Sequence, residues 1–495
     1  MTRSTLEHHD VVIVGAGFSG LGVAIALKRA GFDDVLLVDD ADGAGGVWHW
    51  NTYPGVAVDI PSFSYQFSYA QRADWSRSYA KGAELKQYAE HLVDRFDLAK
   101  QIRFETRVTS ATYDEDTCAW EVATSTGDLT ATHVVHAGGP LSQPKYPDIE
   151  GLDTFAGQVM HTARWDHDVQ LAGRRVAIIG TGASAVQIIP SIAPDVEHLT
   201  VFQRTPIWCL PKADFPLVAP LRAGLGLLPG AKRVARLTSD LYVEATFPFL
   251  AHYGGALQAG KVLEPLALSY LKTQVDDPET RDKLTPRYGL GCKRPSFHNS
   301  YLSTFNRANV ALETGGIARI TPTGVVTTDG VEHPVDVLLL ATGFKVTEKD
   351  ALPGYDVAGR NGLVIADWWE TDRLQAYQGV SAPGFPNFFT TFGPYGYNGS
   401  SYFQLVEATA SHIVRVLTEA RRRGAAEVEV TPRAHERYMD SVRRRRGPQV
   451  FWQPSCAQAN SYYFTKDGDV PLRPALTPEV RWRNAHFPLD DYAYA

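Results

Sequence analysis

Two glycine-rich turns, which begin at Gly15 and Gly180, constrain the fold of this chain more than any other feature of its sequence. Each turn follows a short apolar run rich in β-branched residues, 11–14 in the first case and 175–179 in the second. Each is followed by a stretch of helical composition and then by another apolar run. This order is typical of a Rossmann-type unit, which has a parallel sheet with a ligand at its carboxyl edge. We therefore predict an α/β fold with two Rossmann-type dinucleotide-binding domains.

The first turn has the glycine spacing of a dinucleotide-binding site. In such a site one glycine permits the tight turn, a second lets the backbone approach a pyrophosphate, and a third lets the helix pack on the strand. These positions are held by Gly15, Gly17 and Gly20. Asp39 stands 19 residues after Gly20, where a carboxylate would accept hydrogen bonds from a ribose. A glycine-rich turn without a ligand is the alternative, but the strand before the turn and the acid after it favour a binding site.

The second turn repeats this spacing with one difference that bears on the ligand. The glycine positions are held by Gly180, Gly182 and Ala185. Arg204 stands 19 residues after Ala185, where the first unit has its acid. An arginine suits the additional 2′-phosphate of NADP, which a carboxylate would repel. We therefore expect this unit to bind NADPH in preference to NADH, with a surface arginine near a strand end as the alternative.

Pro- and Gly-rich crossings divide the 495 residues into three segments. We expect 1–150 to form the first part of one dinucleotide-binding domain, with antiparallel strands over 114–132, and 151–335 to form the second domain. Residues 336–495 would return to the first domain and add a C-terminal segment. Within the second domain, the apolar pattern from about 213 to 290 predicts a helical insertion. We interpret this insertion as a buried helical subdomain rather than a surface that lies on a membrane, because no basic amphipathic face accompanies it.

Charge and cysteine spacing exclude several classes of protein. A formal net charge of −7 offers no excess of positive charge for a phosphate backbone, so nucleic acid is not an expected partner. The opening MTRSTLEHHD is polar, which argues against a signal peptide, and no apolar run of about 18 residues predicts a membrane span. The four cysteines contain no C-x-x-C pair, which predicts neither a metal site nor a redox dithiol and favours the cytoplasm. They are Cys118, Cys209, Cys292 and Cys456.

Two dinucleotide sites without a redox dithiol indicate a particular electron path. One dinucleotide would be a flavin, FAD, and the other its reductant, NADPH. With no cysteine pair to take electrons from the flavin, O2 is the acceptor that we expect. The sequence therefore favours a flavin-dependent monooxygenase.

Two further motifs resemble those of a known family. The first reads Gly45-Gly46-Val47-Trp48, then after four residues Tyr53-Pro54-Gly55, then after three more Asp59. The second reads Phe155-Ala156-Gly157, then after three residues His161, then after three more Trp165-Asp166. The first resembles the diagnostic motif of the class I flavoprotein Baeyer–Villiger monooxygenases, and the second resembles their fingerprint in the form that ends in Asp. The resemblance extends over nearly the whole chain.

The resemblance implies a role for an arginine and an acid that are distant in the sequence. Arg294 matches the family's active-site arginine, and Asp59 matches the acid that positions it. A fixed guanidinium beside the flavin would stabilise the oxygen anion that attacks a ketone, and the carboxylate would hold it in place. Without the motifs, the same two residues could equally form a salt bridge between domains.

The resemblance also implies a phosphate site, in which Lys293 and Arg204 share the 2′-phosphate of NADP beside the hydroxyl of Thr205. The complete set of expected cofactor-binding residues is Gly15, Gly17, Gly20, Asp39, Gly46, Trp48, Asp59, Gly180, Gly182, Ala185, Arg204, Thr205 and Lys293. His161 and Trp165 lie beside a crossing, so we expect them to couple the domains, with proton transfer by His161 as the alternative.

Some positions depart from the family pattern or have more than one interpretation. His298-Asn299-Ser300 stands where many members have a carboxylate, and Tyr462 stands where larger members have a tryptophan that helps to hold NADP. The aromatic residues of 394–398 and 462–464 could line an apolar pocket or pack in the core. The arginines of 443–446 are interpreted as a solvated helix end.

These observations predict an FAD-dependent, NADPH-consuming Baeyer–Villiger monooxygenase that inserts one atom of O2 next to the carbonyl of an apolar or cyclic ketone. A flavin-containing or N-hydroxylating monooxygenase, acting on an amine or a sulfide, would share both Rossmann-type units. A non-enzymatic NADPH redox sensor would retain both glycine turns but would have no need for Arg294 and Asp59 beside a flavin.

Overall fold

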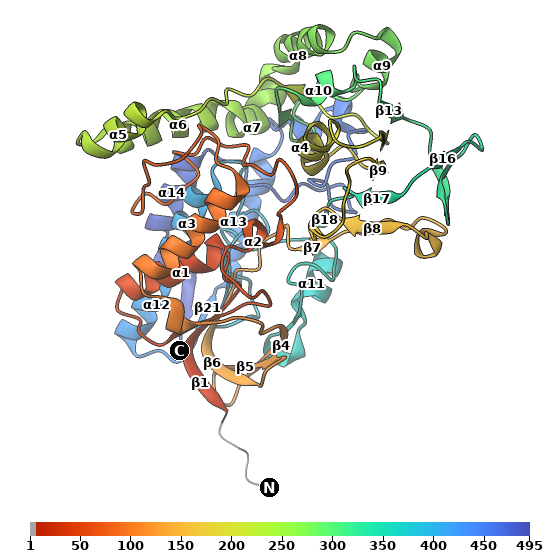
Figure 1. The fold of residues 1–495 in the computed structure, drawn as a ribbon. Coiled ribbons are helices and arrows are strands. Elements are labelled where there is room, and N and C mark those ends of the chain that lie inside the picture. Colours follow the sequence, from red (N-terminus) through yellow and green to blue (C-terminus); the bar gives the residue numbers. More distant parts are fainter. Residues whose placement is uncertain (1–5) are drawn as a thin grey trace.

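Two separate sheets form the framework of the computed structural model, which describes residues 6–495 (Figure 1). Residues 1–5, the start of the polar opening, lie outside this range. The eight-stranded sheet runs in the order β19-β4-β5-β6-β1-β2-β3, with β20 paired to β6. Its strands are β1 (Glu7–Val14), β2 (Val35–Val38), β3 (Ile102–Arg103), β4 (Val108–Asp114), β5 (Ala119–Thr124), β6 (Leu129–His136), β19 (Asp356–Ala358) and β20 (Phe388–Thr390).

Strands β6, β1, β2 and β3 pair in parallel, and β4-β5-β6 form the antiparallel set that the alternating pattern over 114–132 predicts, with β19 added in parallel outside β4. Val11, Val12 and Ile13 of β1 are fully buried, which explains their continuous apolar run: a parallel strand is covered on both faces. The helices of this unit are α1 (Phe18–Arg29), α2 (Val47–Trp50), α3 (Gly82–Arg95), α11 (Ile365–Asp372), α12 (Tyr402–Arg423), α13 (Pro432–Arg445) and α14 (Thr477–His486).

The second sheet is parallel throughout, in the order β13-β10-β9-β17-β8. Its strands are β8 (Gln158–His161), β9 (Arg175–Ile179), β10 (His198–Phe202), β13 (Val310–Glu313) and β17 (Val337–Leu340). Helix α4 (Ala183–Ile192) follows β9, and α10 (Tyr301–Thr304) precedes β13. A small antiparallel sheet, β14 (Ile317–Thr321), β15 (Gly324–Thr327) and β16 (Glu332–Pro334), extends from this unit. The two Rossmann-type units are therefore present.

The position of β17 changes one expected boundary. We expected the second unit to end at 335, but β17 pairs with both β9 and β8 and is an interior strand of the second sheet. The return crossing therefore begins after Leu340. There β18 (Phe344–Lys345) pairs antiparallel with β7 (Gln143–Pro144), so the two crossings lie side by side. The division into domains stays a prediction, but the end of the second domain moves from residue 335 to after Leu340.

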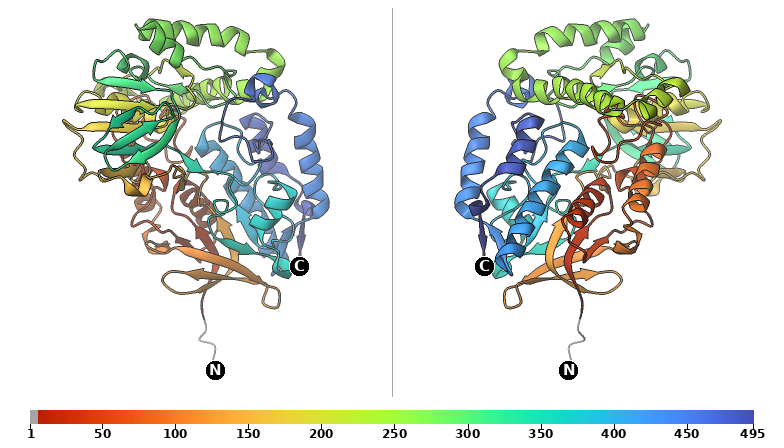
Figure 2. Two further views of the ribbon diagram at one scale, coloured as in Figure 1. Left: turned by 90° about the vertical axis from the view of Figure 1, so that its right-hand side faces the viewer. Right: turned by 90° about the vertical axis from the view of Figure 1, so that its left-hand side faces the viewer.

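The expected helical insertion corresponds to five helices that lie across the top of both units (Figures 1 and 2). They are α5 (Ala219–Leu227), α6 (Ala231–Thr246), α7 (Pro248–Leu257), α8 (Gly260–Gln274) and α9 (Pro278–Lys283). They lie between β11 (Cys209–Leu210) and β12 (Ser296–Phe297), which pair in parallel.

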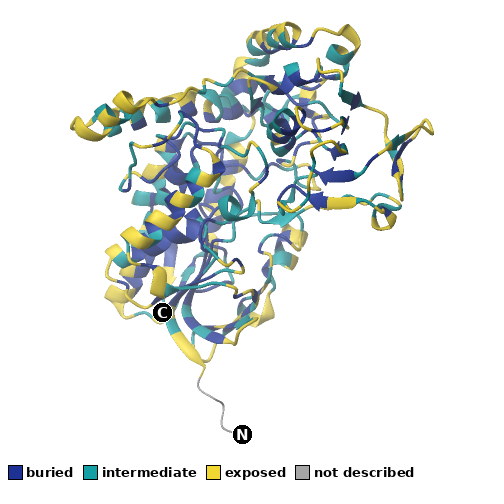
Figure 3. Cartoon of the chain, viewed as in Figure 1, coloured by how far each residue is buried: buried dark blue, intermediate teal, exposed yellow. Residues whose placement is uncertain are grey.

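The interpretation of this insertion as a buried subdomain was wrong for its outer face. Leu227 is 81% exposed, and Val234 and Leu241 of α6 are each 62% exposed, as Figure 3 shows for the arm formed by α5 and α6. Only the inner face of α6 packs, where Arg236 and Val243 are buried. The apolar composition predicted burial, but in an insertion at the edge of two units only the side that faces those units can be buried. None of the helices between residues 6 and 495 has the length and apolar character that crossing a bilayer requires.

The C-terminal elements complete the first unit. Strands β21 (Val428–Val430) and β22 (Tyr492–Tyr494) pair antiparallel, and α12 packs against α1 and α14. The arginines of 443–446 close α13, where positive charge is favourable at a helix C-terminus. Arg445 forms an ion pair with Glu479, and the neighbouring Arg443 and Arg444 are exposed, as expected of a solvated helix end.

Candidate active site

The first glycine turn has the close backbone packing of a phosphate-binding turn. Gly15 has φ +114°, and a Cβ placed on it would lie 2.7 Å from the carbonyl oxygen of Ala137. A Cβ on Gly20 would lie 1.9 Å from the Gly15 oxygen, so both positions require glycine. Gly17 is the N-cap of α1, whose first turn contains no acidic residue, and Gly46 approaches so closely that its own Cβ would lie 3.0 Å from Gly17 Cα. An uncovered helix N-terminus beside two glycines fits a pyrophosphate.

Asp39 and Trp48 both have structural contacts beside this turn. The Asp39 carboxylate accepts hydrogen bonds from the backbone N–H groups of Ala16 (2.5 Å) and Ala41 (2.9 Å), so it holds the turn in shape. Burial raises the pKa of Asp39 despite these bonds. Trp48 Nε1 donates to the hydroxyl of Tyr65 at 3.2 Å, and the Trp48 ring packs against the core of the first unit. Asp39 thus stands at the expected strand end, and Trp48 faces the core.

The second glycine turn repeats the geometry of the first. Gly180 has φ +112°, and a Cβ on it would lie 2.4 Å from the carbonyl oxygen of Ala341. Gly182 is the N-cap of α4, and a Cβ on it would meet no described atom within 4 Å, which leaves space for a ligand at the helix N-terminus. Ala185 is fully buried, as a residue at the helix–strand contact should be. The Thr181 hydroxyl donates to the Thr205 carbonyl at 3.1 Å and joins the turn to the segment after β10.

The Tyr53-Pro54-Gly55 motif docks the first unit on the second. A Cβ on Gly55, which has φ +84°, would lie 2.3 Å from Ser191 Oγ of α4. The Gln187 side chain of α4 accepts from the Tyr53 hydroxyl (3.2 Å) and from the Ala57 N–H (3.2 Å), and it donates to the Ala57 carbonyl (2.9 Å). This docking carries Asp59, which follows directly, to the boundary between the units.

Arg294 and Asp59 meet at that boundary. Arg294 Nε donates to Asp59 Oδ2 at 2.7 Å, although the two residues lie 235 positions apart. Nη1 of Arg294 lies 3.4 Å from the Tyr397 hydroxyl, and the guanidinium lies 5.0 Å from the ring centre of Phe247. The pair is partly open, since 19% of the Arg294 side chain and 38% of the Asp59 side chain are exposed.

The charges of this pair stabilise each other. Burial alone would raise the pKa of Asp59, but the Arg294 guanidinium outweighs it and holds that pKa below its ordinary value. Burial would lower the pKa of Arg294, but Asp59 keeps it well above its ordinary value. Lys212 adds positive charge beside Asp59: its Nζ donates to the Val58 carbonyl at 2.9 Å, while burial lowers its pKa. Both members of the pair are therefore ionised at neutral pH.

Lys293 and Arg204 also lie near each other. The pKa of Lys293 is lowered to about 8, first by burial and then by the positive charge of Arg204. Two cations that repel each other favour an anion between them, and a phosphate group would suit this role. Arg204 is exposed, and the side-chain amide of Asn460 lies 2.8 Å from its Nε. This arrangement fits the expected 2′-phosphate site.

Several tyrosines gather around Arg294. Tyr397 contacts it directly, and burial raises the pKa of Tyr397 to about 12 although Arg294 opposes the shift. Tyr463 is buried, its ring lies 6.0 Å from that of Phe247, and its hydroxyl has no hydrogen-bond partner among residues 6–495. The ring of Tyr462 lies 4.5 Å from that of Tyr463 with the two planes tilted by 53°, and Tyr462 is 45% exposed. Tyr395, by contrast, points to Asp469.

His161 lies at the crossings rather than beside Arg294. It is buried, and its ring lies 5.3 Å from that of Tyr146 and 6.2 Å from that of Phe344, which flank the two crossings. Burial lowers its pKa to about 4, so its ring is neutral at pH 7. Nδ1 accepts from the Ala163 N–H at 3.1 Å. Trp165 packs against the core of the second unit. These contacts favour a coupling role for His161 over proton transfer.

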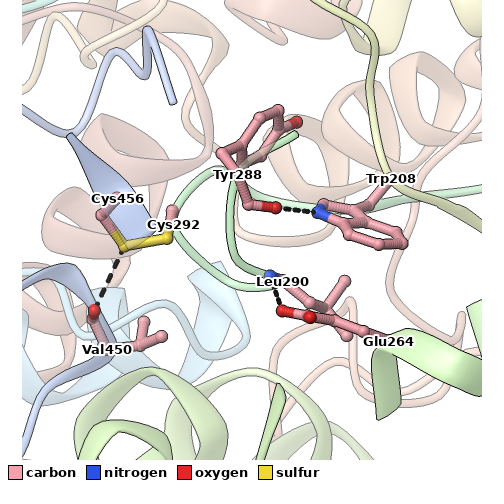
Figure 4. Close-up of a disulfide and its surroundings, with 7 residues drawn as sticks. All are labelled: Trp208, Glu264, Tyr288, Leu290, Cys292, Val450 and Cys456. Atoms are coloured by element: carbon pink, nitrogen blue, oxygen red, sulfur yellow. Dashed lines mark hydrogen bonds between the residues drawn. A yellow bond between two sulfur atoms is a disulfide. The ribbon is translucent and has the colours of Figure 1, made fainter. Parts of the chain in front are cut away.

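Sequence reasoning missed other residues of this region. Lys212, Phe247 and Asn460 come from three separate segments, and no motif marked them. The structure also pairs Cys292 with Cys456, whose Cα atoms lie 5.1 Å apart across a separation of 164 residues (Figure 4). The absence of a C-x-x-C pair did not reveal this disulfide, because spacing along the chain shows only local pairs. Cys118 and Cys209 are free.

Comparison with known proteins agrees with this geometry. Residues 12–217 match the family described as pyridine nucleotide-disulphide oxidoreductase. A Baeyer–Villiger monooxygenase of Streptomyces coelicolor is 37% identical over 98% of this chain and 92% of its own length. The closed crystal structure of cyclohexanone monooxygenase is 31% identical, with a TM-score of 0.89 over 99% of this chain and 100% of its own. A structure of OTEMO with FAD and NADP is 28% identical, with a TM-score of 0.88 over 98% and 99%. The chain therefore belongs to the Baeyer–Villiger monooxygenase family.

Proposed function

We propose that this protein is an FAD-dependent, NADPH-consuming Baeyer–Villiger monooxygenase that converts a ketone to an ester or lactone. One observation carries the proposal: Arg294 and Asp59 form a 2.7 Å ion pair at the boundary between two units that each present a glycine turn. The relative and the structural neighbours, which include cyclohexanone monooxygenase and a complex with FAD and NADP, support it.

FAD belongs at the first turn and NADPH at the second. Gly15, Gly17 and Gly20 would hold the pyrophosphate of FAD, and Gly46 would close on it. Gly180, Gly182 and Ala185 would hold the pyrophosphate of NADPH. When bound, NADPH supplies a hydride and FAD supplies the electron transfer and the activation of O2. Arg204 and Lys293 would bind the 2′-phosphate, and Thr205 would add its hydroxyl.

Arg294 provides a positive charge that does not titrate. A guanidinium keeps its proton at any physiological pH, so it stabilises a nearby oxygen anion without protonating it. Asp59 fixes the guanidinium through Nε, so the two terminal nitrogens, of which Nη1 lies beside the Tyr397 hydroxyl, can face a ligand. Tyr397 and Phe247 cover the guanidinium and limit the access of water, which strengthens its electrostatic effect.

This environment favours a ketone over an amine or sulfide. Attack on a carbonyl carbon requires a nucleophilic, deprotonated oxygen, whereas oxygenation of an amine or sulfide requires a protonated and therefore electrophilic one. Arg294 stabilises the deprotonated form, and Lys212, which lies beside Asp59, adds to the positive charge there. His161, the proton donor that the sequence suggested as an alternative, is neutral and lies at the crossings. We propose an apolar or cyclic ketone, because Tyr397, Tyr462 and Tyr463 line the surroundings of Arg294. A cytoplasmic location fits the supply of NADPH.

A product comparison tests the proposal. The purified holoenzyme would be given NADPH, O2 and either a cyclic ketone or a thioether under single turnover, and the products would be identified by mass spectrometry. We expect lactone in excess of sulfoxide. Sulfoxide or N-oxide as the main product would favour the alternative monooxygenase class, and NADPH binding without any oxygenated product would favour the redox sensor.

A further inference from the structure

The disulfide between Cys292 and Cys456 joins two segments that both belong to the proposed site. Cys292 directly precedes Lys293 and Arg294 in the sequence. Cys456 ends a short 3-10 helix (Pro454–Cys456) of the C-terminal segment, which continues to Asn460, Tyr462 and Tyr463. Both cysteines are buried, at 0% and 4% exposure.

The surroundings of the disulfide fix the side that carries Cys292. Figure 4 shows that the Tyr288 carbonyl accepts from Trp208 Nε1 at 2.9 Å and that the Leu290 N–H donates to Glu264 of α8 at 2.9 Å. Cys292 and Cys456 also belong to a small apolar cluster with Trp208 and Tyr288, separate from the cores of both sheets. The loop before Arg294 is therefore anchored to the insertion on one side and, through sulfur, to the C-terminal segment on the other.

The C-terminal segment has few other regular anchors. Residues 457–476 contain neither helix nor strand. Within the described chain, residues 457–470 make backbone hydrogen bonds only to residues 454–472, and the next bond to a distant backbone is from Tyr395 N–H to the Pro471 carbonyl at 2.9 Å. Long segments without secondary structure are commonly functional, and they open at low free-energy cost. Here the side chain of Asn460 reaches Arg204, and the ring of Tyr463 packs near Phe247 and Arg294.

We propose that the Cys292–Cys456 disulfide is a positioning element that holds the C-terminal segment over the NADP site. It sets the distance between the loop of Lys293 and Arg294 and the segment of Asn460, Tyr462 and Tyr463. This segment covers the site from the side on which Arg204 and Lys293 lie. The inference rests on the proposed function, because it assigns NADP to this site. It gives Tyr462 a role in cofactor retention that depends on the tether.

The tether acts through geometry and not through chemistry. Cys292 acts through the backbone that continues to Lys293 and Arg294, and Cys456 acts through the backbone that continues to Asn460 and Tyr462. Without the bond, the segment from 457 to 470 keeps the packing of the Tyr463 ring and the side-chain contacts of Lys466 with Glu370 and of Asp469 with Tyr395, but it loses its covalent anchor. The open and closed positions of the segment then exchange more freely, and a cofactor held partly by the closed position leaves faster.

The first measurement counts thiols. The holoenzyme would be purified without reductant, denatured in guanidinium chloride and reacted with Ellman's reagent. We expect two reactive thiols of four, from Cys118 and Cys209. Four reactive thiols would overturn the inference at once, because no tether would exist.

The second measurement uses Cys292→Ser/Cys456→Ser as the untethered variant and Cys118→Ser/Cys209→Ser as the matched control. Retained yellow FAD in the holoenzyme reports correct folding, and Cys292→Ala/Cys456→Ala replaces the serine pair if the apolar cluster rejects it. The Kd of NADP+, measured by titration calorimetry without turnover, should rise at least tenfold in the untethered variant only. Limited proteolysis should cleave the untethered variant faster within 457–470, where Lys466 offers trypsin a site.

An unchanged Kd together with an unchanged cleavage rate would overturn the inference. Faster cleavage with an unchanged Kd would also overturn it, because the tether would then be merely structural. These outcomes are separate from a failure of the proposed function, in which the wild-type protein binds NADP+ but yields no ester or lactone from any ketone.

Discussion

Replacement of Arg294 by alanine is the sharpest test of the proposed mechanism. The substitution removes the ion pair with Asp59 at 2.7 Å and the positive charge that would face an oxygen anion. At a separation of about 4 Å and an effective dielectric constant of about 20, two unit charges interact by about 4 kcal/mol. The Arg294 side chain is 19% exposed, so screening by water reduces this value only modestly. A loss of about 3 kcal/mol, similar to the loss of one preorganised donor, corresponds to a roughly 150-fold slower step.

The assay separates the two halves of the reaction. In Arg294→Ala, the rate of flavin bleaching by NADPH under anaerobic conditions should stay within about threefold of wild type, because the glycine turns, Arg204 and Lys293 are unchanged. Ester formation should fall about 150-fold, while NADPH consumption continues and the electrons appear as hydrogen peroxide. Arg294→Lys is the matched control: it keeps the charge but cannot reproduce both the Nε bond to Asp59 and the contact with Tyr397, so it should recover only part of the lost rate. Ester yields in Arg294→Ala close to those of wild type would refute the reasoning.

Three further predictions address the remaining parts of the site. Arg204→Ala should raise the KM for NADPH about tenfold or more while leaving the KM for NADH nearly constant, because only contacts with the 2′-phosphate change. An equal rise for both cofactors in steady-state assays would contradict the assignment of Arg204 to the 2′-phosphate. The kcat/KM for NADPH should decline as the pH rises through about 8, because Lys293, whose pKa is lowered to about 8, then loses the charge that attracts phosphate. Lys293→Arg should abolish this decline. A decline that persists in Lys293→Arg must come from another group. Gly55→Ala should lower the free energy of unfolding by about 2 kcal/mol or more, because the new Cβ would lie 2.3 Å from Ser191 Oγ at φ +84°. The control Gly127→Ala should cost less, because Gly127 has φ +133° but no atom lies within 4 Å of the new Cβ. Equal melting temperatures for the two variants would show that the docking contact is not needed.

Local patterns accounted for the framework of the protein. Each glycine turn is a short-range feature, because Gly15 and Gly180 need positive φ and the strand and helix on either side follow directly in the sequence. The parallel strands were recognisable because burial on both faces demands continuous apolar runs, as in β1 and β17. An apolar run does not indicate which sheet its strand joins. We therefore placed β17 after the end of the second domain, although it pairs with β9 inside that domain.

The site depended on both kinds of information. The resemblance of motifs to a family identified Arg294 and Asp59, but their contact exists only because Gly55 and Gln187 dock the first unit on the second. Tyr397, Phe247 and Lys212 join the pair from distant segments, and no local pattern distinguishes them from core or surface residues.

The two glycine turns, the class of fold and the expected chemistry could all be predicted from the amino-acid sequence, because they depend on backbone conformation and on residue types within short windows. Three features became visible only in the folded protein: the exposed outer face of the insertion, the proximity of Arg204 to Lys293, and the pairing of Cys292 with Cys456. The physical reason is that contact between remote segments depends on how whole units pack against each other. That packing is a sum of many weak apolar and polar contacts, and no single stretch of sequence records it.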